Sequence, residues 1–256
     1  MYHEVSEVTE RRKKTRSTNP AYALSIKQFH NQMNYLHKNG YQTLSLNELL
    51  NNKTPAYQRS LIITFDDGWA NNHTNAFPIL REHGLSATIF IITGFIGQSD
   101  YLDWNQLREM DKEGMSIQSH TVSHKPLVGF PRDQLMYELD ASKKSIEDNL
   151  GKQVDFLSVP HGMINRKVVD MARTLGYKAI CTTEPGFSHR YGDPAIFKRI
   201  NISDRYQIDT FEKIVQINRT IILSLIFFKK IKNLTRKVLG YNNYRKVYRF
   251  LYRIGE

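Results

Sequence analysis

Short apolar runs alternate along the chain with longer segments in which apolar residues recur at helical spacing. The runs 61–65, 87–93 and 177–182 are short and apolar, and the last two are rich in β-branched or aromatic residues, so all three predict buried strands. The segments 26–39 and 131–150 have helical spacing, and each is followed by a glycine. Strands that alternate with helices of this length form parallel βαβ units.

The whole pattern predicts six or seven such units. Strands are expected at 2–5, 61–65, 87–93, 115–118, 154–159, 177–182 and 197–202, and helices at 26–39, 76–83, 104–112, 131–150, 165–175 and 208–218. This order fits either a (β/α) barrel or an open doubly wound sheet. In both architectures the ligand site lies beyond the carboxyl ends of the strands.

Composition narrows the class of protein. The chain has 256 residues, the size of one large or two small domains. Its single cysteine, Cys181, excludes an intrachain disulfide and a cysteine zinc cluster, and its place on a predicted strand indicates a small core residue. The longest uncharged stretch, 84–99, is too short and too polar for a membrane span. Met1 is followed by a polar, charged segment, so no signal peptide is visible in this chain.

The net charge of +11 is concentrated at the C-terminal end. Residues 219–256 contain ten Lys or Arg and one acid, whereas residues 1–218 contain 26 basic and 24 acidic residues. A nearly neutral globular part argues against nucleic-acid binding by the whole fold. We therefore expect two parts, a domain at 1–218 and a basic amphipathic helical tail at 219–256.

The tail combines apolar, aromatic and basic residues. Residues 221–228 are apolar apart from Ser224, and three lysines follow at 229, 230 and 232. Tyrosines then recur every three or four residues at 241, 244, 248 and 252, with basic residues between them. This pattern favours an anionic membrane surface as partner; packing on the core and binding to an anionic glycan are the alternatives.

Two adjacent carboxylates, Asp66 and Asp67, follow the predicted strand 61–65 and precede Gly68. Carboxylates at the end of a buried strand are costly unless a ligand or a reaction uses them. Because adjacent residues of an extended chain point to opposite sides, one carboxylate can hold a metal ion while the other remains a free base. Asp-Gly is also a common turn dipeptide, so the pair alone leaves both interpretations open.

Two histidines four residues apart, His120 and His124, follow the predicted strand 115–118. This spacing brings both imidazoles to one side if the segment turns helically. Two imidazoles with a carboxylate as third ligand suit a divalent metal ion that keeps open positions for water. Paired histidines are also common as ordinary polar residues, so the pair by itself does not establish a metal site.

A third polar loop, Pro160-His161-Gly162, follows another predicted strand. Proline and glycine fix a tight loop whose backbone N–H groups can hold an oxyanion. The carboxyl ends of parallel strands meet at one edge, so the three loops are expected to lie together. Asp67, His120 and His124 would then surround a metal ion, and Asp66 would stand beside them as a base.

These motifs resemble those of polysaccharide deacetylases with the NodB homology domain, carbohydrate esterase family four. Thr64-Phe65-Asp66-Asp67-Gly68 looks like the first family motif, and His120-Thr-Val-Ser-His124 looks like the second, His-Ser/Thr-x-x-His. Pro160-His161-Gly162 looks like the end of the third, Arg-x-Pro-Tyr-Gly. The opening Met1-Tyr2-His3-Glu4-Val5 resembles the start of the branch that acts on exopolysaccharide. The resemblance covers about residues 1–218, with the core motifs from about residue 59.

The resemblance implies an α/β fold, a distorted (β/α) barrel of about seven parallel strands. It also implies metal-dependent removal of N-acetyl groups from a glycan, in exopolysaccharide or cell-envelope metabolism. Asp67, His120 and His124 match the family's metal ligands, with zinc as the expected ion, and Asp66 matches its general base. The backbone N–H of His161, after Pro160, falls where the family's tyrosine supplies an oxyanion contact.

Three features depart from the family pattern. Ser158 stands where the third motif has arginine, so the usual partner of the catalytic aspartate is missing, and His161 stands where it has tyrosine. The late Leu-x-His motif, which supplies the general acid in many members, is not visible. The candidates for this acid are His3, His161, His189 and a water molecule; we favour His3 because the motif around it is part of the resemblance.

The leading interpretation is thus a polysaccharide N-deacetylase, with the cell envelope or a membrane surface as its favoured location. The alternative is a catalytically silent glycan-binding or assembly protein that keeps the fold and the metal, although the intact Asp66 argues against it. A metal-dependent hydrolase of a small cyclic amide is a third class, but the basic tail and the exopolysaccharide-like start favour a polymer. Trp104, at the start of a predicted helix, either stacks on a sugar or packs in the core.

Overall fold

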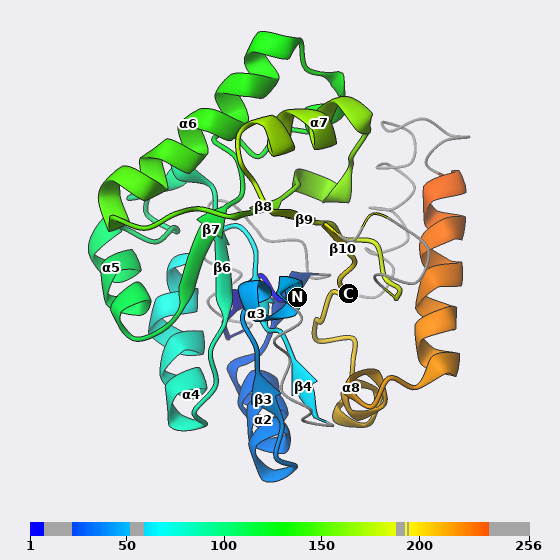
Figure 1. Cartoon of the computed structure of the whole chain (residues 1–256). Coiled ribbons are helices and arrows are strands. Elements are labelled where there is room, and N and C mark those ends of the chain that lie inside the picture. Colours follow the sequence, from blue (N-terminus) through cyan, green and yellow to red (C-terminus); the bar gives the residue numbers. More distant parts are fainter. Residues whose placement is uncertain (8–21, 52–58, 188–192, 194, 236–256) are drawn as a thin grey trace.

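A curled parallel sheet forms the centre of the molecule (Figure 1). In this computed structural model the described residues are 1–7, 22–51, 59–187, 193 and 195–235. The sheet has six strands in the order β10-β9-β8-β7-β6-β5. Their bounds are β5 Thr64–Phe65, β6 Thr88–Ile91, β7 Ser116–Ser119, β8 Phe156–Ser158, β9 Ala179–Cys181 and β10 Ile196–Phe197. Two small parallel pairs lie beside it, β1 Glu4–Val5 with β2 Ala23–Leu24 and β3 Gln42–Thr43 with β4 Ser60–Leu61.

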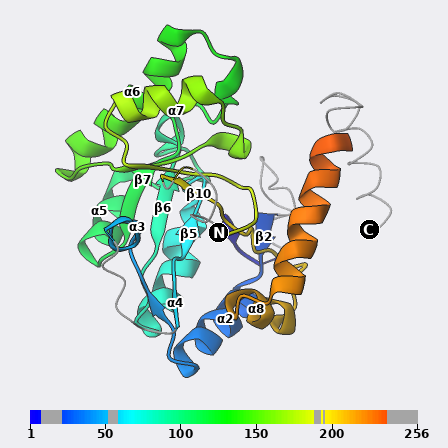
Figure 2. The ribbon, with the colours of Figure 1, turned by 45° about the vertical axis from the view of Figure 1, so that its right-hand side comes forward.

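Helices cover the outside of this sheet (Figures 1 and 2). The α-helices are α2 Ile26–Lys38, α3 Leu46–Leu50, α4 Phe77–Glu82, α5 Trp104–Lys112, α6 Arg132–Leu150, α7 Arg166–Thr174 and α8 Ile208–Val215. A π-helical segment, Asn72–Ala76, leads into α4. The short 3-10 turns are Thr93–Phe95, Leu127–Gly129 and Pro160–Gly162. The core between helices and sheet is built from fully buried side chains such as Phe29, Ile89, Leu139 and Leu157.

The first residues of the chain fill part of the gap between the two edges of the curled sheet. Tyr2 forms an isolated parallel bridge with Phe65 of β5. On the other side, the Ile202 N–H donates a hydrogen bond of 2.9 Å to the Met1 carbonyl. The described sheet therefore has six strands instead of the predicted seven or so, and residues 1–2 stand beside β5 without forming a full ladder.

Capping residues explain why the predicted helix bounds agree with the structure. The Ser25 side chain accepts the Gln28 N–H at the start of α2, and Asp103 forms a capping box at the start of α5. Gly151 ends α6 in the left-handed conformation, which a residue with a side chain adopts only at a cost. The predicted strand 61–65 is split into β4 and β5.

The first part of the predicted tail is a helix, residues 219–235, drawn in orange in Figure 1. It packs on the core through the buried Ile222 and the partly buried Ile221 and Leu225. The four tail tyrosines lie outside the described residues. None of the helices in the described ranges has both the length and the apolar character needed to span a bilayer.

Candidate active site

The three polar loops meet at the carboxyl ends of β5, β7 and β8, as the alternation of strands and helices predicts. Asp67, Thr121, His124 and His161 in these loops all have positive φ angles, between 57° and 76°. Such a conformation is costly for a residue with a side chain and persists only where the surrounding structure holds it. The clustering of strained residues at one edge of the sheet marks a functional site.

Asp67, His120 and His124 converge on one point. Oδ1 of Asp67 lies 3.4 Å from Nε2 of His120 and 3.4 Å from Nε2 of His124. The two imidazole rings are 4.8 Å apart at their centroids. The ligand atoms of the three residues all lie within 4.8 Å of one another, a group that could hold a metal ion.

Hydrogen bonds outside this group fix the direction in which two of the ligands, His120 and Asp67, face. Nδ1 of His120 lies 2.7 Å from the carbonyl oxygen of Ser158, so this nitrogen carries the hydrogen and donates. In the neutral ring, Nε2 therefore presents a lone pair to Oδ1 of Asp67, which is itself buried without a hydrogen-bond partner among the described residues. Trp69 Nε1–H donates to the other carboxylate oxygen, at 3.1 Å. A lone pair and a carboxylate oxygen that face each other in this way are stabilised by a proton or a metal cation between them, and two imidazoles with one carboxylate fit a divalent metal ion.

Protonation states support the same interpretation. Burial would raise the pKa of Asp67, but its close contact with His120 and the charges of His3 and His124 hold this pKa well below its usual range. Burial, and then repulsion by His120, lowers the pKa of His124 to about 4. At neutral pH Asp67 is thus ionised and His124 neutral, as metal ligation requires. Burial also opposes charge on His120, but the Asp66 and Asp67 carboxylates outweigh it and raise the pKa of this imidazole, so a metal ion that binds here would displace a proton from it.

The second carboxylate, Asp66, is held by an arginine that the sequence motifs did not reveal. Arg199, two residues beyond β10, donates from Nη1 to Oδ1 of Asp66 at 2.7 Å and from Nη2 to Oδ2 at 2.7 Å. The Ser158 hydroxyl donates to the same Oδ2 at 3.0 Å, and Arg199 Nη2 donates to the Ser158 hydroxyl oxygen at 2.8 Å. The motif arginine is absent at position 158, but Asp66 still has a guanidinium partner, because an arginine from a different strand–loop unit supplies it.

This ion pair sets the charge of Asp66. Burial would raise the pKa of the carboxyl group, but the Arg199 guanidinium outweighs it and lowers the pKa to about 2. Both groups are almost fully buried, so solvent screens their interaction weakly. Asp66 therefore stays ionised across the physiological range and keeps acceptor capacity toward the cavity.

The site opens into a cavity of about 250 Å³, whose lining includes Asp66, Asp67, His120 and His124. His3 also lines this cavity, although it lies far from the other motifs in the sequence. Its ring packs 4.6 Å from that of Tyr22, its Nδ1 has no hydrogen-bond partner among the described residues, and burial lowers its pKa. His189 lies outside the described residues.

An aromatic wall lines one side of the cavity. The rings of Trp69 and Tyr101 are stacked at a centroid distance of 4.7 Å, and Phe95 lies 5.0 Å from Tyr101. Such flat apolar surfaces beside polar groups suit the face of a sugar ring. Trp104, the residue considered for this role from the sequence, instead packs against the hydrophobic core and does not line the cavity.

The Pro160–Gly162 turn also borders the cavity, through His161. The His161 ring lies 5.0 Å from that of His124, and the Thr183 hydroxyl donates to the His161 carbonyl at 3.2 Å. Gly162 has φ of +69°, and a Cβ atom there would lie 2.7 Å from the Thr183 nitrogen. The close approach of these two loops thus requires glycine at this position.

Comparison with known proteins agrees with this geometry. Residues 53–180, half of the chain, match the family model described as polysaccharide deacetylase. YxkH of Bacillus subtilis is 37% identical over 181 residues, which are 69% of this chain and 64% of that relative. The chain thus spans just under two thirds of the length of this relative.

Two further comparisons extend beyond the motifs. The poly-β-1,6-N-acetyl-D-glucosamine N-deacetylase of Staphylococcus aureus is 28% identical over 211 residues, covering 76% of this chain and 71% of that enzyme. The structure of the Streptococcus pyogenes deacetylase PplD, in complex with acetate, superposes with a TM-score of 0.74 at 26% identity, covering 84% of this chain and 94% of that one. The chain belongs to the polysaccharide deacetylase family.

Proposed function

We propose that this chain is a metal-dependent polysaccharide N-deacetylase, which hydrolyses the acetamide C–N bond of an N-acetylated glycan and releases acetate. The observation that carries the proposal is that two adjacent carboxylates, Asp66 and Asp67, line one cavity and have different partners. Asp67 faces two imidazoles at 3.4 Å, whereas Asp66 is held by Arg199. One carboxylate can therefore hold a metal ion while its neighbour serves as a base.

Asp67, His120 and His124 would hold the ion, and zinc is our proposal because two imidazoles and one carboxylate are a common zinc ligand set. When bound, such an ion polarises a carbonyl group and lowers the pKa of water. Asp66 accepts the proton of the attacking water. Arg199 is a positioning residue, which keeps Asp66 ionised and fixes the plane of its carboxylate.

The Pro160–Gly162 turn and His3 complete the proposed reaction. The backbone N–H of His161 would stabilise the oxyanion that forms when water attacks the acetamide. Pro160 and the left-handed φ of His161 (59°) fix the direction of this turn. His3 would pass the proton that Asp66 takes from the attacking water on to the leaving amine, because its imidazole lines the cavity and its Nδ1 is free of hydrogen bonds to described residues.

The proposed substrate class is an exopolysaccharide or cell-envelope glycan that contains N-acetylglucosamine. The name of the Staphylococcus aureus relative and the aromatic wall support this choice. The alternative of a catalytically silent glycan-binding protein rested on the absent motif arginine and on the absent late histidine. Since Arg199 takes the place of that arginine beside Asp66, the enzymatic function is favoured.

The test is acetate release from N-acetylglucosamine oligomers by the metal-free protein before and after addition of zinc. We expect release only with metal, and we expect Asp66→Asn and Asp67→Ala to lose at least about a hundredfold in rate. Asp66→Asn should still bind the metal, whereas Asp67→Ala should bind it weakly. Metal binding without release from any N-acetylated glycan would contradict the proposed reaction.

We also propose that helix 219–235 docks on an anionic membrane surface. Its outer face, defined by Leu223, Phe227, Phe228, Ile231 and Leu234, is 45–65% exposed. The exposed Lys230 lies beside this face. Exposed phenylalanines next to lysines are typical of helices that lie in the interface of an anionic bilayer.

Sedimentation with phospholipid vesicles tests this docking. The chain should sediment with vesicles that contain phosphatidylserine and much less with neutral phosphatidylcholine vesicles. Phe227→Ser/Phe228→Ser should lose most of the binding, whereas Tyr137→Ser should keep it, because Tyr137 is an equally exposed aromatic residue on α6. Equal binding by both variants would contradict a role of the outer face.

A further inference from the structure

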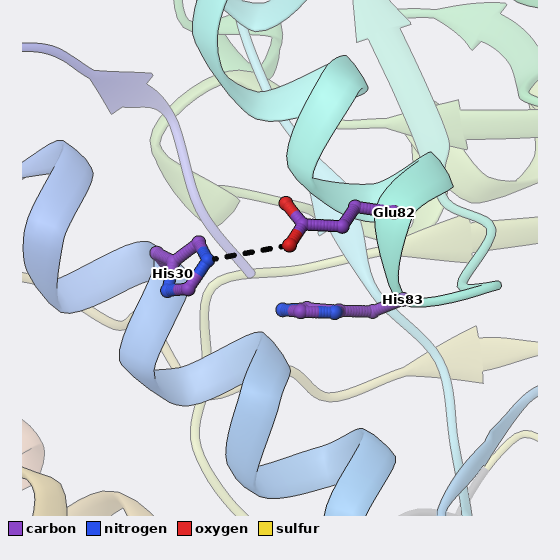
Figure 3. A group of neighbouring side chains, drawn as sticks. All are labelled: His30, Glu82 and His83. Atoms are coloured by element: carbon purple, nitrogen blue, oxygen red, sulfur yellow. Dashed lines mark ion pairs between the residues drawn. The ribbon is translucent and has the colours of Figure 1, made fainter.

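A second cluster of possible metal ligands lies between α2 and α4, outside the cavity described above. His30 comes from α2, Glu82 is the last residue of α4, and His83 follows it as the helix cap. Their ligand atoms all lie within 4.8 Å of one another. Figure 3 shows that the His30 imidazole faces the Glu82 carboxylate, while the His83 ring extends below that carboxylate toward His30.

We propose that His30, Glu82 and His83 bind a divalent transition-metal ion of the zinc class, with water completing the coordination. Two imidazoles and one carboxylate are the ligands that such ions prefer. The ion would join α2 to α4, which lie about fifty residues apart in the sequence. This accessory site is independent of the proposed deacetylase reaction, because none of its ligands lines the catalytic cavity.

His83 is the anchor of the cluster. His83 is only 9% exposed, and its Nε2 atom is buried without a hydrogen-bond partner among the described residues. A buried imidazole nitrogen without a partner is costly, and a metal ion would satisfy it.

Contacts around His83 hold its ring in place. The His37 ring stacks on it at a centroid distance of 5.6 Å, and Nδ1 of His37 lies 3.1 Å from the His83 carbonyl oxygen. Support of a ligand by neighbouring groups is typical of metal sites, because it fixes the direction of the lone pair.

The other two ligands are free to adjust. The side chains of His30 and Glu82 are 44% and 60% exposed, and His30 Nε2 lies 3.7 Å from Glu82 Oε1. The rings of His30 and His83 are 5.3 Å apart at their centroids. Ligand atoms bonded to one zinc ion at about 2.0–2.2 Å are about 3.3–3.5 Å apart in a tetrahedron. Small rotations of two exposed side chains close the remaining gap.

Neighbouring charges permit a cation at this point. Arg81 precedes Glu82, but its guanidinium lies 3.3 Å from the Glu113 carboxylate and is paired there. His73 and Glu109 border the same surface pocket as Glu82 and form a similar imidazole–carboxylate pair at 2.9 Å, which is not part of any group of three candidate ligands among the described residues. This pair provides a matched control, since it has one imidazole and one carboxylate but not the second imidazole of the proposed site.

Zinc stoichiometry tests the proposal. The tag-free protein is dialysed to equilibrium against zinc, and the bound metal is counted by mass spectrometry. We expect two ions per chain in the natural sequence and one in His124→Ala, which disables the catalytic site. His124→Ala/His30→Ala and His124→Ala/Glu82→Gln should bind none, whereas His124→Ala/His73→Ala should still bind one. The changed residues of the accessory site are exposed, so these variants are expected to fold.

A second readout follows from linkage. An ion that joins two helices only in the folded state raises the melting temperature. Zinc should therefore raise the melting temperature of His124→Ala and leave that of His124→Ala/His30→Ala unchanged. The proposal is overturned if His124→Ala binds no zinc, or if its ion and its thermal shift survive the loss of His30 or Glu82. Neither result depends on whether the chain has deacetylase activity.

Discussion

The ion pair between Arg199 and Asp66 makes the sharpest prediction about this chain. The guanidinium is 8% exposed and donates two hydrogen bonds of 2.7 Å to the two carboxylate oxygens. Arg199→Met keeps most of the side-chain length and removes the charge and all donors. Asp66 would then remain buried without its counter-charge, and the Ser158 hydroxyl would lose its donor.

Two routes give the size of the effect. Removal of one partner from a buried ion pair costs about 3–5 kcal/mol of unfolding free energy, because the other charge stays buried. The pKa of Asp66 is about 2 instead of 3.8. Since one pKa unit corresponds to about 1.36 kcal/mol, its surroundings stabilise the ionised form by about 2–3 kcal/mol. A lowered pKa contributes stability above about pH 4 and loses it as the pH falls through about 2, so the effect is complete at pH 7.

Urea unfolding of the metal-free protein at pH 7 measures this loss. Arg199→Met should lower the unfolding free energy by about 3–5 kcal/mol. In an Asp66→Asn background the same change should cost much less or even stabilise, because no negative charge remains to be left unpaired. If Arg199→Met costs the same in both backgrounds, packing of the guanidinium over the Phe90 ring, 5.2 Å away, explains the loss and our reasoning is wrong. In the natural background, Arg199→Lys should lower the unfolding free energy by less than Arg199→Met does, since lysine keeps the charge but not the paired donors.

Three further predictions concern the site and the core. Gly162→Ala should lower the unfolding free energy by more than about 1 kcal/mol in a urea titration, because φ at Gly162 is +69° and the new Cβ atom meets a backbone nitrogen. The control Gly129→Ala should be nearly neutral, because its Cβ atom meets no atom within 4 Å. Cys181 is fully buried, and burial raises the pKa of its thiol to about 12. A disulfide reagent should therefore modify one thiol per chain in urea and none in the native protein, and rapid labelling of the native protein would contradict this burial. Trp69→Phe removes the hydrogen bond from the indole to the Asp67 carboxylate. It should weaken zinc affinity about 10–100-fold in a chelator competition, and an unchanged affinity would exclude a supporting role for the indole.

Features set by local sequence were predictable. The predicted helix 104–112 matches α5, because Asp103 caps its start and Gly114 follows its end. The three polar loops were placed at one edge of the sheet because parallel strands leave no other arrangement for residues that follow them. His3 was assigned to the site through a resemblance, and the structure indeed brings it to the cavity.

Features set by distant contacts were not predictable. The aromatic wall depends on the stacking of Trp69 and Tyr101, which lie on different loops, and neither residue stands in a pattern that distinguishes it from a core aromatic. The strand 61–65 is interrupted because its two ends pair with different partners, β3 at Leu61 and β6 at Thr64. Apolar periodicity carries no signal for such a change of partner.

Arg199 shows why a departure from a motif is weak evidence of lost function. Its contact with Asp66 joins residues 133 positions apart, so no local pattern could reveal it. The Asp66 carboxylate needs a guanidinium within hydrogen-bonding distance, and arginines on more than one strand–loop unit can reach that position. Serine at position 158 leaves room for the arginine and bonds both to it and to Asp66. Ser158 of β8 and Arg199 therefore form one arrangement around Asp66, in which the guanidinium comes from a residue that follows β10.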